Sequence, residues 1–387
     1  MGGGDRPKPP PKSSRLICRA VLGDKSSVLR PRIEWLLAFL PAAVALPRLA
    51  PDAHVAIFVC ACLAIVPLAA WLGRTTERLA EHTGAGIGGL LNATFGNAAE
   101  MIIALTALRS GLVAVVKASI TGAIVGNLLL VLGAALFAGG VRHQTQHFNA
   151  AAVRSQATML LLAAVALVAP ASYHHLAGGE AAAREGSLSL EVSLVLLISY
   201  GLGLVFSLGT HRELFAGHTG EAAAAEEDCH VPWSVARSLS TLGGITVLIA
   251  WMSEILVGSV EHVAHSFGMS DVFVGVIVVA VVGNSAEQST AILVAMRNRM
   301  DLALSIAIGS SIQIALFVAP VLVLASYLIA DRPMNLVFTP AEVLAVTFSA
   351  IIAGQICGDG ESNWLEGAQL LAVYVILALL FYFLPTH

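Results

Sequence analysis

Long apolar segments alternate with short polar connections along most of the 387-residue chain. Eleven of these segments come close to the roughly 20 residues that an α-helix needs to cross about 30 Å of hydrocarbon. They lie near residues 33–49, 53–73, 85–108, 113–139, 150–170, 188–209, 234–260, 272–296, 302–329, 339–357 and 364–384. The segment from Thr339 to Glu342 resembles a capping box, which predicts a helix start at Pro340. The pattern predicts an all-α integral membrane protein with about 11 transmembrane helices.

The amino-acid composition agrees with this pattern. Hydrophobic residues make up 57% of the chain and charged residues only 12%, and the mean hydropathy is +0.82. A soluble globular protein usually carries about 25% charged residues. A soluble fold with so few charges would lack a polar surface, so we expect the chain to lie in a lipid bilayer.

Charge and cysteine content argue against two other classes of protein. The net charge is −4 and the basic residues are scattered, so we expect no nucleic-acid partner. The five cysteines are also scattered, and none forms a Cys-x-x-Cys pair. Neither a disulfide framework nor a zinc site is therefore indicated.

The distribution of charge predicts the orientation of the chain. Residues 1–32 carry eight Lys or Arg residues, which is typical of a basic tail kept in the cytosol. With the tail in the cytosol, the predicted cytosolic loops carry eight further basic residues and the opposite side carries five. Residues 33–52 then form a peripheral first helix. The acidic segment 211–232 is interpreted as a cytosolic linker.

Two segments of the chain repeat each other. The sequence Gly-Asn-Ala-Ala-Glu at 96–100 recurs as Gly-Asn-Ser-Ala-Glu at 283–287, and flanking blocks match in the same order. The repeat units are residues 53–210 and 233–387, and each contains five predicted spans. Because five is odd, consecutive copies cross the membrane in opposite directions. The sequence therefore predicts two inverted five-helix repeats, an architecture frequent among secondary transporters.

Each repeat places a carboxylate near mid-membrane. Glu100 and Glu287 lie near the centres of their predicted spans, where an ionisable side chain is expensive and usually functional. Asn97 and Asn284 precede them by three residues, so they are expected on the same helix face. The alternative, neutralisation by an Arg of the same span, is disfavoured because the nearest Arg is nine or ten positions away.

Further oxygen atoms are expected around these carboxylates. Gly96 and Gly283 allow a helix to break and to free backbone carbonyls, and Asn127 and Gln313 lie near the centres of the following spans. The two amides serve either as ligands or as interhelical hydrogen-bonding groups. An oxygen-rich set without Cys or His suits Ca²⁺ and argues against Zn²⁺ or Cu⁺. Two carboxylates neutralise one divalent cation, and two protons can replace it.

Three other acidic residues are candidates for the route to this site. Glu77 and Glu261 are repeat mates at opposite membrane faces, and Glu254 lies inside the seventh span. The alternative interpretation of Glu77 and Glu261 is that of solvated side chains at helix ends, and Glu254 is the stronger candidate for the route. The run from Gly309 to Ser311 is interpreted as a place of close helix packing rather than as a source of ligands.

At these motifs the chain resembles the calcium/proton exchangers of the calcium/cation antiporter superfamily. The most specific matches lie at 91–100, 282–287, 309–313 and 359–367. The resemblance implies eleven helices, with a peripheral first helix and two inverted repeats. It also implies that Glu100 and Glu287 exchange ions, with Asn97, Asn284 and Gln313 nearby. Many members have His after the second motif Glu, where this chain has Gln288.

The sequence thus predicts a transporter, not an enzyme, that exchanges Ca²⁺ for H⁺ without a resident cofactor. The alternatives are a Na⁺/Ca²⁺ exchanger on the same fold, a Ca²⁺ channel and an intramembrane carboxyl protease. The expected partners are Ca²⁺, H⁺ and the bilayer, and a homo-oligomer remains open. The short flanking segments favour the plasma membrane of a bacterium over a vacuolar membrane.

Overall fold

The computed structural model describes residues 33–177, 182–215 and 233–384, which are almost entirely helical. The first part of the chain contains η1 (Ile33–Ala38), α2 (Phe39–Leu49), α3 (His54–Glu81), α4 (Gly84–Phe95), α5 (Ala98–Arg109), α6 (Val113–Val125), η2 (Gly126–Val131), α7 (Leu132–Arg142), β1 (Gln146–His147), α8 (Ala150–Ala177), α9 (Ala182–Leu204), η4 (Val205–Thr210) and α10 (Arg212–Phe215). The second part contains α12 (Val235–Phe267), α13 (Asp271–Phe273), η5 (Val274–Val279), α14 (Ala280–Gly283), α15 (Ser285–Ala295), α16 (Met300–Gln313), η6 (Ile314–Val318), α17 (Ala319–Ile329), α18 (Pro340–Ile356), β2 (Glu361–Ser362) and α19 (Trp364–Phe383).

The described residues contain seven helices that are long and apolar enough to cross a membrane. They are His54–Ala80, Val113–Arg142, Ala150–Ala177, Arg184–Thr210, Val235–Phe267, Met300–Ile329 and Trp364–Phe383. An eighth crossing is counted if the pair Val274–Gly283 and Glu287–Ala295, bent by 67°, is one span. The predicted spans near 33–49, 85–108 and 339–357 are short or broken helices here, so the number of crossings is smaller by this measure than the predicted eleven.

Several spans contain π-helical turns in their middle. The segment η2 interrupts the helix that begins with α6, and η6 interrupts the helix that begins with α16. A third π-helical segment, η5, forms the first part of the bent span. Such turns widen the helix locally and are frequent at functional sites. Asn127 lies in η2, and Gln313 is the last residue before η6.

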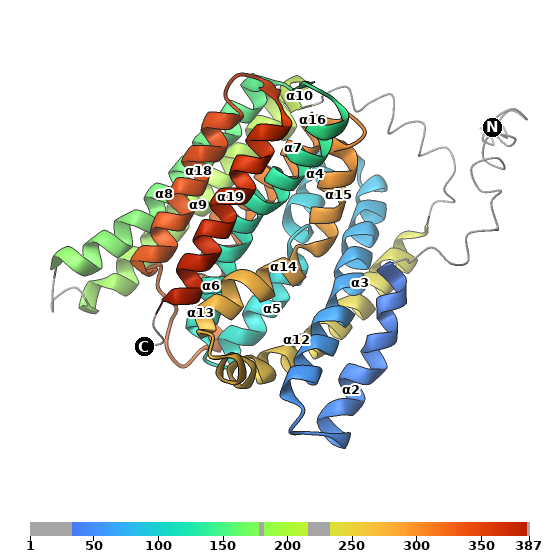
Figure 1. Ribbon diagram of the computed structural model, residues 1–387, viewed down its shortest axis with the longest axis vertical. Coiled ribbons are helices and arrows are strands. Elements are labelled where there is room, and N and C mark those ends of the chain that lie inside the picture. The colour runs from blue at the N-terminus through green and yellow to red at the C-terminus, as the bar shows by residue number, and fades with distance from the viewer. Residues whose placement is uncertain (1–32, 178–181, 216–232, 385–387) are drawn as a thin grey trace, which may run out of the picture.

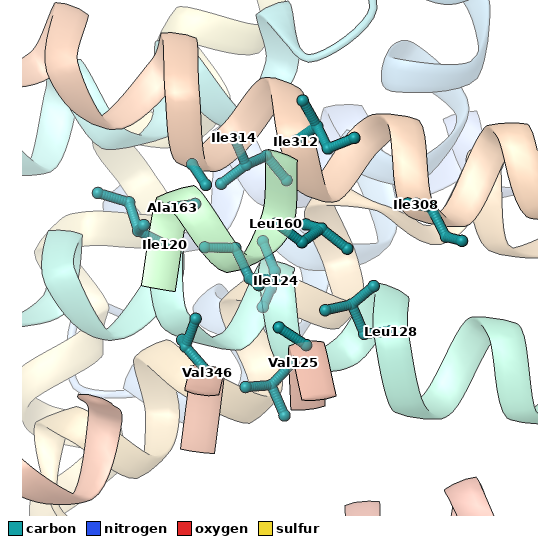
Figure 2. Close-up of a cluster of buried hydrophobic side chains, with 14 of the residues drawn as sticks. Ile120, Ile124, Val125, Leu128, Leu160, Ala163, Ile308, Ile312, Ile314 and Val346 are labelled. Carbon is teal, nitrogen blue, oxygen red and sulfur yellow. The ribbon is translucent and has the colours of Figure 1, made fainter. Parts of the chain in front are cut away.

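The helices form three groups across the molecule. The helices α8, α9, α18 and α19 lie on one side, and α2, α3 and α12 lie on the other (Figure 1). The half-helices α4, α5, α14 and α15 lie between these groups (Figure 1). The central span that begins with α6 packs its apolar face against α8, α16 and α18, where Ile120, Ile124, Leu160, Ile308 and Val346 are buried together (Figure 2).

Connections from the two halves meet at both ends of the bundle. At one end β1 pairs with β2 in antiparallel fashion, with Gln146 opposite Ser362. At the other end the Lys117 ammonium donates hydrogen bonds to Asn335 Oδ1 (2.5 Å) and to the Val337 carbonyl (2.7 Å). The first end is the one predicted to face the cytosol. In each case the loops that meet are ones predicted to lie on the same side of the membrane.

The predicted capping box at the start of α18 is confirmed. The Thr339 hydroxyl accepts a hydrogen bond from the Glu342 backbone, and the Glu342 carboxylate accepts one from the Thr339 backbone. These bonds satisfy backbone donors that the first helical turn leaves without partners. The start of α18 is thus fixed by local sequence.

Candidate functional site

Both repeated motifs lie at helix breaks. Helix α4 ends just before Gly96, and Asn97 stands immediately before α5 with φ −100° and ψ 28°. In the second motif α14 ends at Gly283, and Asn284 stands before α15 with φ −89° and ψ 4°. The predicted spans 85–108 and 272–296 are therefore each two half-helices. The sequence analysis anticipated that the two glycines would allow such breaks.

The breaks give each motif a useful electrostatic arrangement. Glu100 lies in the first turn of α5, and Glu287 lies in the first turn of α15. The N-terminus of a helix carries a partial positive charge that stabilises a nearby carboxylate. The preceding half-helices α4 and α14 end at the same breaks, and a helix C-terminus carries a partial negative charge that favours a cation. Each break therefore places a carboxyl side chain at the start of one half-helix, beside the end of the preceding one.

The two motifs face each other in the middle of the protein. A methyl group added to Gly283 would lie 3.3 Å from Glu100 Cγ and 3.4 Å from Glu100 Oε1. The two carboxyl groups are also close enough for the charge of Glu287 to act on Glu100. The fold thus brings together two acidic side chains that lie 187 positions apart in the sequence.

Several oxygen atoms of this site are buried and lack a hydrogen-bond donor. They are Glu100 Oε2, Glu287 Oε2 and Asn284 Oδ1. The Asn284 amide nitrogen is occupied, because it donates to the Ala280 carbonyl of its own helix (3.0 Å). Buried acceptors without partners are unfavourable and rare in folded proteins. A bound cation or bound protons would satisfy all three atoms.

A hydrogen-bond network extends the site into the neighbouring spans. Asn97 Nδ2 donates to Gln313 Oε1 (2.5 Å), and the Ser310 hydroxyl donates to Asn97 Oδ1 (3.0 Å). Asn127 Nδ2 donates in turn to the Ser310 oxygen (3.0 Å). The predicted amides Asn127 and Gln313 are therefore both present, and both form interhelical hydrogen bonds. The repeat mates Asn97 and Asn284 differ, because only Asn97 is tied into this network.

Ser310 is the residue that the sequence analysis missed. Its hydroxyl also lies within reach of Glu287. A hydroxyl has a single proton, and in this structure Ser310 donates it to Asn97. The signal was available, because Ser310 precedes Gln313 by three positions and such residues share a helix face. The interpretation of 309–311 as close packing gave this polar position too little weight.

The chemistry of the site is that of oxygen ligands. The described residues contain no group of three or more His, Cys, Asp and Glu side chains that could hold a metal ion. Ligands beyond the two carboxylates must therefore be amide, hydroxyl, backbone or water oxygens. That set fits a hard cation such as Ca²⁺, which takes six to eight oxygen atoms.

The three predicted pathway residues lie outside this cluster. Glu77 is exposed on α3, and Glu254 and Glu261 are exposed on α12. Their role in ion access stays a prediction. The basic tail, residues 1–32, and most of the acidic linker, residues 216–232, lie outside the described residues.

Similarity to solved structures defines the class of protein. The structure of native YfkE superimposes with a TM-score of 0.77 at 39% identity and covers 91% of this chain and 100% of that chain. The crystal structure of the H⁺/Ca²⁺ exchanger CAX superimposes with a TM-score of 0.65, and at 17% identity this likeness concerns the fold alone. The fold and its facing carboxylates place the protein among multi-pass membrane ion exchangers.

Sequence relatives give the family. The model of the sodium/calcium exchanger protein family matches twice, at residues 53–209 and 237–383. A Ca²⁺/H⁺ antiporter of Aphanothece halophytica is 45% identical over 90% of this chain and 96% of its own length. The Ca²⁺/H⁺ antiporter ChaA of Bacillus subtilis is 44% identical over 85% of this chain and 92% of its own length. The chain belongs to the sodium/calcium exchanger protein family and, within it, to the calcium/proton exchangers.

Proposed function

We propose that this protein exports Ca²⁺ from the cytosol in exchange for protons by alternating access. The observation that carries the proposal is the pair of facing carboxyl groups, Glu100 and Glu287, whose Oε2 atoms are buried without a donor. Two carboxylates balance the charge of one Ca²⁺, and two protons balance it equally well. The same pair of oxygen-bearing groups therefore holds either cargo, but not both together.

The residues around the pair would have distinct roles. Asn284 Oδ1 has no donor and is available as a cation ligand without any rearrangement. The side-chain amides of Asn97 and Gln313 are hydrogen-bonded to each other, and the Ser310 hydroxyl donates a hydrogen bond to Asn97. We assign Ser310 a switching role, because its proton turns toward Glu287 when that carboxylate is ionised and toward Asn97 when Glu287 is neutral or bound to Ca²⁺.

An inverted-repeat architecture accounts for access from both sides. We propose that residues 33–52 form a peripheral helix and that 53–210 and 233–387 form two inverted five-helix repeats, eleven helices in all, joined by the acidic linker 211–232. Two observations support this division. The family model matches each unit separately, and each unit contains one helix break at its Gly-Asn motif. Rocking of one repeat against the other would open the midplane site to each side in turn.

The relatives and the charge distribution support a particular membrane for this protein and an orientation of the chain in it. The similar Ca²⁺/H⁺ antiporters of Aphanothece halophytica and Bacillus subtilis are bacterial proteins. We therefore propose the plasma membrane of a bacterium, with the basic tail in the cytosol. Na⁺/Ca²⁺ exchange on the same fold is the second candidate. It is less well supported, because two relatives that are 45% and 44% identical to this chain bear the name of Ca²⁺/H⁺ antiporters.

The proposal is tested by replacing one carboxyl group at a time with an amide that cannot ionise. Inverted membrane vesicles with an acidic lumen should take up Ca²⁺ through the wild-type protein. Glu100→Gln and Glu287→Gln should each abolish this uptake, because a neutral amide neither balances Ca²⁺ nor carries a proton. Glu191→Gln, the same change at an exposed position of α9, is the matched control and should transport normally.

Three results would contradict the proposal. Normal proton-driven uptake in either Glu100→Gln or Glu287→Gln would show that the facing carboxyl groups do not carry the exchange. Uptake that follows an imposed Na⁺ gradient at equal pH on both sides would favour Na⁺/Ca²⁺ exchange. Ca²⁺ flux without proton movement would identify a channel.

A further inference from the structure

The long helices α3 and α12 run antiparallel, and each end of the pair is closed by a ring contact. At one end the imidazole rings of His54 and His262 are stacked, with centroids 3.9 Å apart and an interplanar angle of 21°. At the other end the guanidinium groups of Arg78 and Arg237 both lie 4.2 Å from the Trp233 ring centroid. His54 begins α3 and His262 lies near the end of α12, so the two contacts are separated by the length of α3.

The two contacts occupy equivalent places in the repeat. Arg78 directly follows Glu77, and His262 directly follows the repeat mate Glu261. In both cases the residue after the repeated Glu rests on an aromatic ring at the start of the opposite helix. The contact on the predicted cytosolic side uses Arg, which stays charged at every physiological pH. The contact on the outer side pairs two histidines, the type of side chain that serves as a protonation switch near neutral pH.

The pair of helices is coupled to the exchange site by packing. One buried cluster joins Ile65 of α3 and Met252 of α12 to Ala99 and Ile103 of α5. The same cluster includes Val279 of η5, which belongs to the bent span of the second motif. Ala99 is the neighbour of Glu100. A change in the spacing of α3 and α12 therefore reaches the half-helices that carry the carboxylates.

We propose that the His54–His262 stack is a proton-operated latch on the outer end of the α3–α12 pair, a regulatory site that acts on the proposed exchange function. Neutral imidazole rings attract each other in a stack. When both rings are protonated, two positive charges face each other at 3.9 Å and repel, so the stack opens. An acidic outer compartment would thus loosen the outer end of the pair and ease the access of protons to the site. The Arg78–Trp233–Arg237 contact has no such response.

Other charged groups lie on the elements packed at this end. They are Arg48 at the end of α2, Asp52 before α3, Arg109 at the end of α5, and Glu261 and His265 on α12. Asp52 lines a surface pocket together with His54 and Ser266. Once both rings are protonated, repulsion between the two positive charges opens the stack.

The transport test compares the wild type with the double variant His54→Phe/His262→Phe, which keeps two stacked rings but cannot bind protons. Uptake into inverted vesicles is measured at saturating Ca²⁺ and constant external pH while the luminal pH is varied. The ratio of the wild-type rate to the variant rate should rise about five-fold as the lumen is acidified from about pH 8 to about pH 5. A five-fold effect is at the lower end of the coupling that is typical between two sites. His265→Phe, one helical turn beyond His262 and exposed, is the control and should behave as the wild type. A constant ratio would overturn the latch.

A second measurement does not depend on transport. Ser266→Cys places a thiol at the pocket beside His54, and its modification by a membrane-impermeant maleimide is quantified by peptide mass spectrometry. At acidic pH this position should react faster with the histidines present than with both replaced by Phe, and the rates should agree at alkaline pH. Equal rates at every pH would also overturn the latch. Because labelling needs no ion exchange, this result separates a failure of the latch from a failure of the proposed function.

Discussion

Gly283 offers a way to move one carboxylate of the site without changing its charge. A methyl group added there would lie 3.3 Å from Glu100 Cγ and 3.4 Å from Oε1, closer than most contacts of a side-chain Cβ atom. Both contacts involve the same carboxylate-bearing side chain, which must shift by a few tenths of an ångström in Gly283→Ala. The bonds between Ca²⁺ and its oxygen ligands are about 2.3–2.6 Å long, so a shift of this size matters for the cation.

The expected magnitude follows from that displacement. A misplacement of about 1 Å at a reacting centre costs about a hundred-fold in rate, so a few tenths of an ångström corresponds to roughly a three- to ten-fold loss. We expect Gly283→Ala to raise the KM for Ca²⁺ by about five-fold on this basis, with a smaller change in the maximal rate. Initial rates of radioactive calcium uptake into inverted vesicles, measured over a range of Ca²⁺ concentrations, give both quantities.

Gly309→Ala is the matched control for this prediction. Gly309 lies in α16 immediately before Ser310, but a methyl group added there would meet nothing within 4 Å. Its KM should remain that of the wild type. An unchanged KM in Gly283→Ala would refute the close approach of Gly283 and Glu100. An equal rise in both variants would show that the effect comes from helix flexibility rather than from contact with the carboxylate.

Two further predictions concern packing and pH. A methyl group added to Gly122 of α6 would overlap the Val276 carbonyl of η5, whereas at Gly126 it would meet nothing within 4 Å. Gly122→Ala should therefore destabilise the protein by about 1–3 kcal/mol and Gly126→Ala should not, and the midpoints of thermal unfolding in detergent would show the difference. In the proposed exchange, protons and Ca²⁺ compete for the same carboxylates, so the KM for Ca²⁺ should rise as the pH on the Ca²⁺ side falls, by at most about a hundred-fold per pH unit if two protons compete. A KM that is independent of pH would argue against a shared site.

Much of the fold was determined by local sequence. The apolar segments predicted the positions of the long helices, because a helix in lipid must satisfy its own backbone and needs a fixed length of apolar residues. The start of α18 followed from the Thr339–Glu342 capping box, which involves only neighbouring residues. The motifs at 96–100 and 283–287 marked the two helix breaks, since Gly and Asn are poor residues for a helix interior.

The contents of the site depended on contacts that no local pattern contains. Asn97 and Ser310 are 213 positions apart in the chain, and their hydrogen bond exists only because the fold brings the break before α5 next to Ser310 of α16. The same packing ties Asn97 to Gln313 but leaves its repeat mate Asn284 with a free oxygen. Sequence symmetry suggested equal roles for the two asparagines, and the tertiary structure makes them different.

The sequence by itself thus determined that the chain is a membrane protein with two related carboxylate motifs. Hydrophobic segments and internal repeats are properties of the linear sequence and do not depend on tertiary contacts. Only the tertiary structure decided which groups meet. It placed Glu254 on an exposed face of α12 rather than beside the motif carboxylates, and it stacked His54 on His262. The physical reason is that side-chain partners depend on the rotation and crossing of helices, which are set by packing over the whole molecule.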